Sequence, residues 1–101
     1  MRVLLNVTFP HAEFNAAVRD GSVGRKMNQI LEELKPETVY FTEQNGHRGA
    51  VLAVELSDAS KVPALAEPWF LLFNADVEIR IAMTPGDLQK SGIDVIGKKW
   101  A

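Results

Sequence analysis

The order of patterns along the chain predicts an α+β domain of the ferredoxin-like type. We expect the element order βαββαβ, a four-stranded antiparallel sheet with its helices on one face, and a C-terminal helical tail. Residues 2–9 alternate apolar and polar side chains with the period of a strand. Residues 37–55 form two alternating segments joined by Asn45-Gly46, a pair typical of a two-residue type I′ hairpin turn. Residues 75–84 alternate again after a helical region.

Size and composition indicate one domain over residues 1–101. The net charge of -2 disfavours nucleic acid and anionic lipid as general partners. We expect no cofactor and no metal site, because the chain has no cysteine and only two histidines. No apolar run is long enough to span a membrane, and the first residues resemble a strand rather than a signal peptide. A cytoplasmic location is therefore expected.

The first helical region is expected to begin at Pro10 and to run to Lys35, with a kink at residues 20–24. Its apolar side chains fall on one helical face on both sides of the kink. Pro36 should end it. The next strand then enters the hairpin.

The hairpin turn sets the pairing of the two strands that it joins. If Gln44 faces His47, then Glu43 faces Arg48, and the pairs that follow put one apolar set on the core face. That set comprises Val39, Phe41, Leu52 and Val54.

A second helical region should begin at Ser57 or Asp58 and reach Leu72, with Pro63 and Pro68 splitting it into short pieces. Its expected buried residues are Val62, Leu65, Trp69, Leu72 and Phe73. The last strand should direct Val77, Ile79, Ile81 and Met83 inward. Thr84-Pro85, with Asp87, is typical of the start of a final helix.

The second face of such a sheet has no cover within the chain. Its side chains are of mixed polarity, and exposed mixed faces of this size commonly meet a partner. We therefore expect a homodimer that presses two such faces together and holds a small organic ligand between its sheets. The face is formed by Leu4, Asn6, Thr8, Thr38, Tyr40, Thr42, Val51, Ala53, Glu78 and Arg80.

The segment "GSVGRKMNQI" contains two glycines at the spacing of the GXXG loop of KH domains, which clamps a nucleic-acid backbone. Its loop residues would be Gly21, Gly24, Arg25 and Lys26. The alternative is structural: Gly21 ends one helical segment and Ser22 caps the next. The structural interpretation is favoured, because a fourth strand has no place in the minimal KH order.

Four segments together cover more than half of the chain and resemble an uncharacterised family of short bacterial proteins. They are "VRDGSVGRKMNQIL", "KPETVYFTEQNGHRGA", "VPALAEPWFLLFNADVE" and "MTPGDLQKSGIDVIGKKW". The resemblance implies a ferredoxin-like dimer of the dimeric α/β-barrel type without an assigned activity. Some members carry a pantothenate synthetase-like label. That label is not supported here, because such a ligase needs a nucleotide-binding domain that 101 residues do not supply.

Cofactor-free monooxygenases, isomerases and haem-degrading enzymes share this fold, so an enzyme of the first two kinds is an alternative to a binding protein. Asn6 and Trp69 resemble two residues of the haem-degrading members, whose third residue is a histidine that this chain lacks between Ser57 and Asn74. The candidate ligand-pocket residues are Asn6, Thr8, His11, Tyr40, Trp69 and Arg80. Each has a structural alternative, such as core packing for Trp69 and a solvated helix start for His11.

Overall fold

Strand β1 (Arg2–Thr8) lies at the centre of the sheet in a computed structural model that describes residues 1–101. Its side chains alternate between buried and half-buried, as the sequence pattern predicts. Strand β3 (His47–Glu55) pairs with one side of β1 and β4 (Asp76–Ile81) with the other. Strand β2 (Thr38–Gln44) completes the order β2-β3-β1-β4, and every pairing is antiparallel. This topology confirms the ferredoxin-like prediction.

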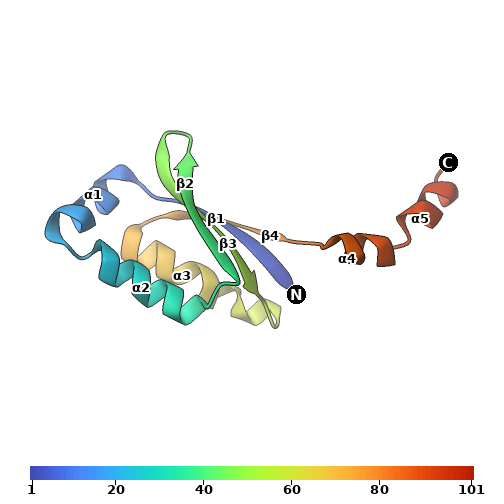
Figure 1. Cartoon of the computed structure of the whole chain (residues 1–101), viewed down its shortest axis with the longest axis horizontal. Coiled ribbons are helices and arrows are strands. Elements are labelled where there is room, and N and C mark those ends of the chain that lie inside the picture. Colours follow the sequence, from blue (N-terminus) through green and yellow to red (C-terminus); the bar gives the residue numbers. More distant parts are fainter.

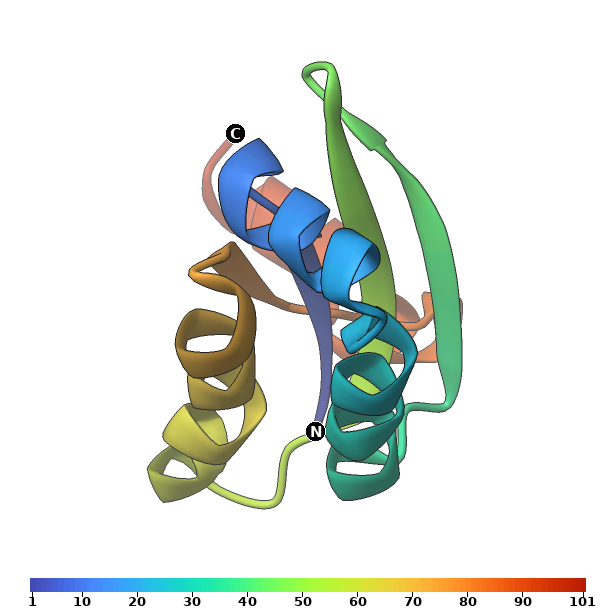
Figure 2. The same cartoon turned by 90° about the vertical axis from the view of Figure 1, so that its left-hand side faces the viewer.

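Three helices cover one face of this sheet: α1 (His11–Asp20), α2 (Val23–Leu34) and α3 (Val62–Phe73), as Figures 1 and 2 show. The expected single kinked helix is two helices. Gly21 adopts the left-handed conformation, with φ 83°, and its N–H bonds to the Val18 carbonyl. A residue with a side chain pays a steric cost there, so glycine favours the break. Helix α2 ends one residue before the expected Lys35.

The β2–β3 hairpin has the register that the Asn45-Gly46 turn predicts. Gln44 pairs with His47 and Glu43 with Arg48, and the remaining predicted pairs follow without a slip. Asn45 and Gly46 have φ angles of 51° and 81°, as a type I′ turn requires. The Gly46 N–H donates to the Glu43 side chain at 2.6 Å. The Glu43 carboxylate, which faces Arg48 across the hairpin, is thus bonded to the turn.

Helix α3 is continuous, so the prediction that prolines split this region is wrong. Asp58 accepts a hydrogen bond from the Ser60 N–H at 2.9 Å and caps a short 3₁₀ turn, Ala59–Lys61, that leads into α3. Pro63 lies in the first helical turn, where no N–H is needed. Pro68 lies inside the helix and removes one hydrogen bond. Burial of the helix face around Trp69 offsets that loss.

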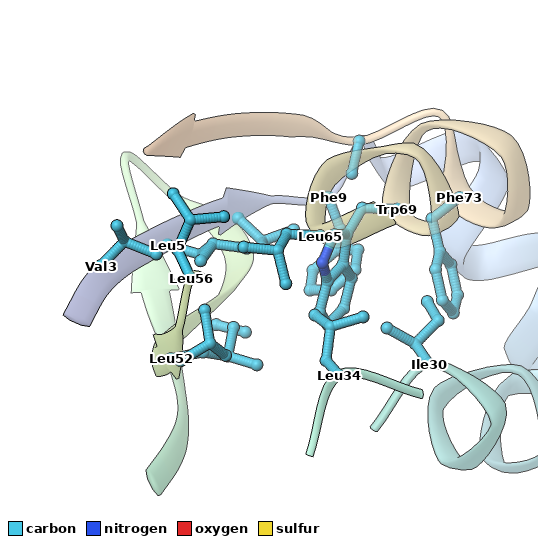
Figure 3. Close-up of a cluster of buried hydrophobic side chains, with 14 of the residues drawn as sticks. Val3, Leu5, Phe9, Ile30, Leu34, Leu52, Leu56, Leu65, Trp69 and Phe73 are labelled. Carbon is cyan, nitrogen blue, oxygen red and sulfur yellow. The ribbon is translucent and has the colours of Figure 1, made fainter. Parts of the chain in front are cut away.

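The core lies between the sheet and the three helices (Figure 3). At its centre, the Phe9 ring makes edge-to-face contacts with Trp69, at 5.9 Å between ring centroids, and with Phe73, at 5.2 Å. The other large, fully buried side chains are Val3, Leu5, Val7, Ile30, Leu52 and Val54. Of the apolar positions predicted to face inward, Phe41 is 57% exposed, because the hairpin extends past the helical layer.

The C-terminal residues leave the body of the protein. Strand β4 ends at Ile81, which is 69% exposed, so the prediction that Ile81 and Met83 point into the core is wrong. The chain leaves the sheet there, beyond the cover of the helices (Figure 1). Thr84 and Asp87 form the expected capping box at the start of α4 (Pro85–Lys90), and α5 (Ile93–Lys99) follows.

The projecting residues make the molecule long. Its principal extents are 58 × 28 × 20 Å, and its radius of gyration is 16.9 Å. A compact chain of this length has a radius of gyration of about 13 Å. None of the helices has the length and hydrophobicity that crossing a bilayer requires.

Candidate ligand-binding cleft

The open face of the sheet carries four of the candidate residues in a regular grid. Across the strands, Tyr40 lies beside Val51, Val51 beside Asn6, and Asn6 beside Glu78. Since neighbouring strands are about 4.8 Å apart, Asn6 and Tyr40 are roughly 10 Å apart with an apolar residue between them. The adjacent rows are Thr38–Ala53–Leu4–Arg80 and Thr42–Gly49–Thr8–Asp76. This face is a broad, mixed surface rather than a pocket.

The other two candidates lie elsewhere. Trp69 is fully buried on the helical side of the sheet, where its Nε1 atom has no hydrogen-bond partner. It is a core residue and does not reach the open face. His11 lies at the start of α1 and stacks on His47, with ring centroids 4.2 Å apart. The structure contains no group of three or more histidine, cysteine, aspartate or glutamate side chains arranged to hold a metal ion.

The Gly21–Gly24 segment forms the junction between α1 and α2. The Asp20 side chain accepts a hydrogen bond from the Ser22 N–H at 2.8 Å, so a carboxylate occupies the start of α2. The Ser22 hydroxyl and N–H beside it, with smaller contributions from Lys26 and Arg25, lower the pKa of Asp20. Ser22 itself makes no capping bond with its side chain, contrary to the structural prediction. A negative charge at this helix start disfavours a phosphate there.

A cleft of about 470 Å³ opens between the α1–α2 pair and the β2–β3 hairpin. The tip of the hairpin projects beyond the helical layer (Figure 2). Phe9 forms part of the lining, and Phe14 lies against it with ring centroids 4.9 Å apart. The lining residues are Phe9, Phe14, Val23, Gly24, Met27, Phe41, Thr42, Arg48 and Gly49.

Arg48 is the one ionisable residue of this lining. Its Nη1 donates to Asn15 Oδ1 at 2.8 Å, and its Cζ lies 4.6 Å from the centroid of the Phe14 ring. These two contacts hold the guanidinium in place. Neither of the two ion pairs of the chain includes Arg48, because Glu43, its cross-strand neighbour, bonds to the turn instead. The cleft therefore combines aromatic walls with one positioned, unpaired positive charge.

Comparison with known proteins identifies the fold and no family. No protein-family model and no curated protein matches the chain. Among solved structures, it is similar to the 5-chloro-2-hydroxyhydroquinone dehydrochlorinase TftG of Burkholderia phenoliruptrix AC1100, in complex with 2,5-dihydroxybenzoquinone. The TM-score is 0.58 and the identity 19%, over 86% of this chain and 99% of that one. A de novo designed protein, Ferredog-Diesel, matches over 80% of this chain and 85% of its own at 9% identity, with a TM-score of 0.45.

The resemblance to an uncharacterised bacterial family stays a prediction. The likeness to TftG supports the ferredoxin-like fold. Of the cleft residues, only Gly24 was a sequence candidate, and then as part of a nucleic-acid loop rather than a ligand pocket. The hairpin register offered one further indication. It places Arg48 on the same sheet face as Phe41, and an arginine on a core-facing position is unusual unless it is paired or functional.

Proposed function

We propose that this protein is a homodimer that binds a small, planar organic anion in the cleft beside Arg48. The observation that carries the proposal is the unpaired guanidinium, positioned by Asn15 and Phe14 at an otherwise apolar cleft. An anion that reaches it gains charge-assisted hydrogen bonds, which are stronger than neutral ones. Aromatic walls favour a flat ligand by stacking and edge contacts.

The size of the cleft supports a ligand of this kind. Its volume of about 470 Å³ lies within the range of about 300–1,000 Å³ that is usual for small-molecule sites. Thr42 and Gly49 also border the cleft, which otherwise presents apolar side chains around Arg48. Arginine does not act as an acid or base in proteins. The lining is therefore suited to binding, and it contains no side chain that would act as an acid or a base.

The neighbour TftG holds 2,5-dihydroxybenzoquinone, a planar compound with acidic hydroxyl groups. At 19% identity, the ligand of TftG serves as a probe for this chain, but the likeness does not indicate which residues would bind it. The argument for the ligand class therefore depends on the cleft itself.

Dimerisation is proposed through the open face of the sheet. Tyr40 is largely exposed there, beside Val51 and Leu4, and no helix covers them. A second copy of the same face would bury these apolar side chains and leave the cleft, on the other side of the sheet, free for a ligand. Asn6, Tyr40 and Arg80 then form a second candidate ligand site, between the two sheets.

Calorimetric titration with 2,5-dihydroxybenzoquinone tests the proposal and separates the two sites. We expect Arg48→Gln to weaken binding about 10- to 100-fold, since a hydrogen bond to a charged group contributes about 1.5–3 kcal/mol. Arg19→Gln, on the exposed last turn of α1, is the matched control and should leave the affinity unchanged. A neutral planar compound, 1,4-dimethoxybenzene, should bind more weakly than the anion.

Two results would count against the proposed cleft. Loss of binding in Arg80→Gln but not in Arg48→Gln would move the ligand to the open face. Equal affinity of the wild type and Arg48→Gln, with Arg80→Gln also unchanged, would remove the role of a positioned cation altogether.

A further inference from the structure

The C-terminal arm, residues 84–101, has a structure that its own contacts do not explain. Helices α4 and α5 have six and seven residues, and neither packs to any extent against the rest of the protein. Isolated helices shorter than about 12–15 residues are marginal in water. The arm therefore needs a surface against which to pack, and its own body does not provide one.

The arm carries an apolar face suited to such a contact. Ile93, Ile96, Gly97 and Trp100 are spaced at i, i+3, i+4 and i+7, so they share one side of α5. All three of the large side chains are exposed, and Trp100 is 78% exposed. An exposed tryptophan at the end of an apolar stripe is typical of an anchor residue in an interface.

A groove of about 360 Å³ lies between α2 and α3, on the outer side of the helical layer. Its lining includes Leu71, which is 79% exposed, and the two glutamates Glu33 and Glu67. The groove is lined by Gln29, Ile30, Glu33, Pro63, Ala64, Glu67, Pro68, Leu71 and Leu72.

Charge distinguishes this groove from the ligand cleft as the place for the arm. Lys98 and Lys99 precede Trp100, and the Lys99 amino group lies 5.9 Å from the centroid of its ring. Two positive charges beside the tryptophan are attracted by the two glutamates of the groove. The cleft presents Arg48 instead, which would repel them.

The arm lies on the side of the sheet opposite the helices, so it points away from its own groove. Figure 1 shows it leaving the body beyond β4, and Figure 2, viewed from the helical side, shows it behind the sheet. A second sheet packed on the open face would lie about 10 Å away, and its helices about 10 Å further. Two helices of six and seven residues at about 1.5 Å per residue, with their connections, span roughly 25–30 Å and reach that layer.

We propose that the C-terminal arm of each copy docks in the α2–α3 groove of a second copy, with Trp100 against the exposed Leu71. The two lysines of the arm then lie beside the two glutamates of the groove. The exchange is reciprocal, as a two-fold symmetric dimer requires. This inference rests on the proposed homodimer and is independent of the ligand.

Cysteine cross-linking tests the placement directly, because the chain has no cysteine of its own. One copy carries A101C, and a second copy of different mass carries A64C in the groove. We expect oxidation to join the two copies, since a disulfide requires Cα atoms within about 7 Å. A12C, exposed on α1, replaces A64C as the control and should not be joined. Equal yields with A64C and A12C would overturn the proposal, as would an intramolecular bond in a chain carrying both A101C and A64C.

The dimer dissociation constant, measured by sedimentation, provides the energetic test. Trp100→Ala should raise it at least tenfold, whereas Val95→Ala, which lies outside the apolar stripe of α5, should leave it nearly unchanged. Glu67→Lys should raise it severalfold and Lys99→Glu in the same chain should restore it. A dimer unaffected by Trp100→Ala and without the A101C–A64C bond refutes arm docking and leaves the sheet-to-sheet dimer standing. A wild-type monomer at every concentration refutes both.

Discussion

Replacement of Trp69 tests whether this residue is only a core residue. Its side chain is fully buried, yet its indole N–H has no partner among the surrounding groups. Trp69→Ala leaves a large cavity and should cost about 3–5 kcal/mol of unfolding free energy. Trp69→Phe keeps a six-membered ring and removes about two apolar carbons, which costs roughly 1.6 kcal/mol at about 0.8 kcal/mol for each. It also removes the unpaired N–H, whose burial costs about 1–3 kcal/mol.

The two effects of Trp69→Phe nearly cancel, so we expect its free energy of unfolding to lie within about 1 kcal/mol of the wild type. Urea denaturation followed by circular dichroism measures this difference. All variants are compared at one protein concentration, because the stability of the proposed dimer would depend on concentration. Trp69→Ala serves as the reference for a large loss. A loss above about 2 kcal/mol in Trp69→Phe would show that the N–H contributes a hydrogen bond and that the reasoning is wrong. Reduced ligand affinity in a stable Trp69→Phe variant would show that Trp69 contributes to ligand binding.

Two further predictions concern the hairpin and the start of the arm. A Cβ atom at Gly49 would lie 2.7 Å from Gln44 Cγ and 3.1 Å from the Val7 carbonyl oxygen, so Gly49→Ala should destabilise by about 1–3 kcal/mol in urea denaturation. Gly24→Ala, with nothing within 4 Å, is the control, and should be neutral or stabilising; equal losses would contradict the packing argument. Hydrogen bonds from the Thr84 N–H and hydroxyl lower the pKa of Asp87, so its stabilisation of α4 is complete above the unfolded pKa of about 4 and is lost as the pH falls through the lower folded value. A titration of Asp87 by NMR should show this lowered pKa in the wild type and a smaller lowering in Thr84→Ala, which removes the hydroxyl and keeps the backbone N–H that contributes most; an identical titration in both would contradict a contribution of the hydroxyl.

The sheet could be predicted from the sequence because its determinants are local. Asn45 and Gly46 select one turn type, and that turn sets the register of every pair in the hairpin. The alternation of β1 likewise identifies the face that the helices cover. Gly21 ends α1 through its own backbone preference. In each case a few neighbouring residues contain the information.

The errors occur where tertiary contacts decide. Pro68 has a strong local tendency to end a helix, and burial of the surrounding face overrides it. Ile81 alternates correctly with Ile79, but its exposure depends on how far the helices extend over the sheet. The cleft was missed for the same reason. Phe41 is on the predicted face, and only the distance between the hairpin and the helical layer turns a core position into a cleft wall.

The cleft, the α2–α3 groove and the open face would take different partners under these proposals, because they lie at separate parts of the domain. The ligand cleft and the α2–α3 groove both lie on the helical side, at different parts of α2: Met27 lines the first and Ile30 the second. The open face and the arm lie on the other side. There the side chain of Glu37 raises the pKa of Arg2, and the charge of Asp87 in α4 adds a smaller contribution. An arm that emerges on that side reaches only a copy whose sheet covers the open face. Sheet pairing and arm docking would therefore reinforce each other, whereas neither would cover the cleft beside Arg48.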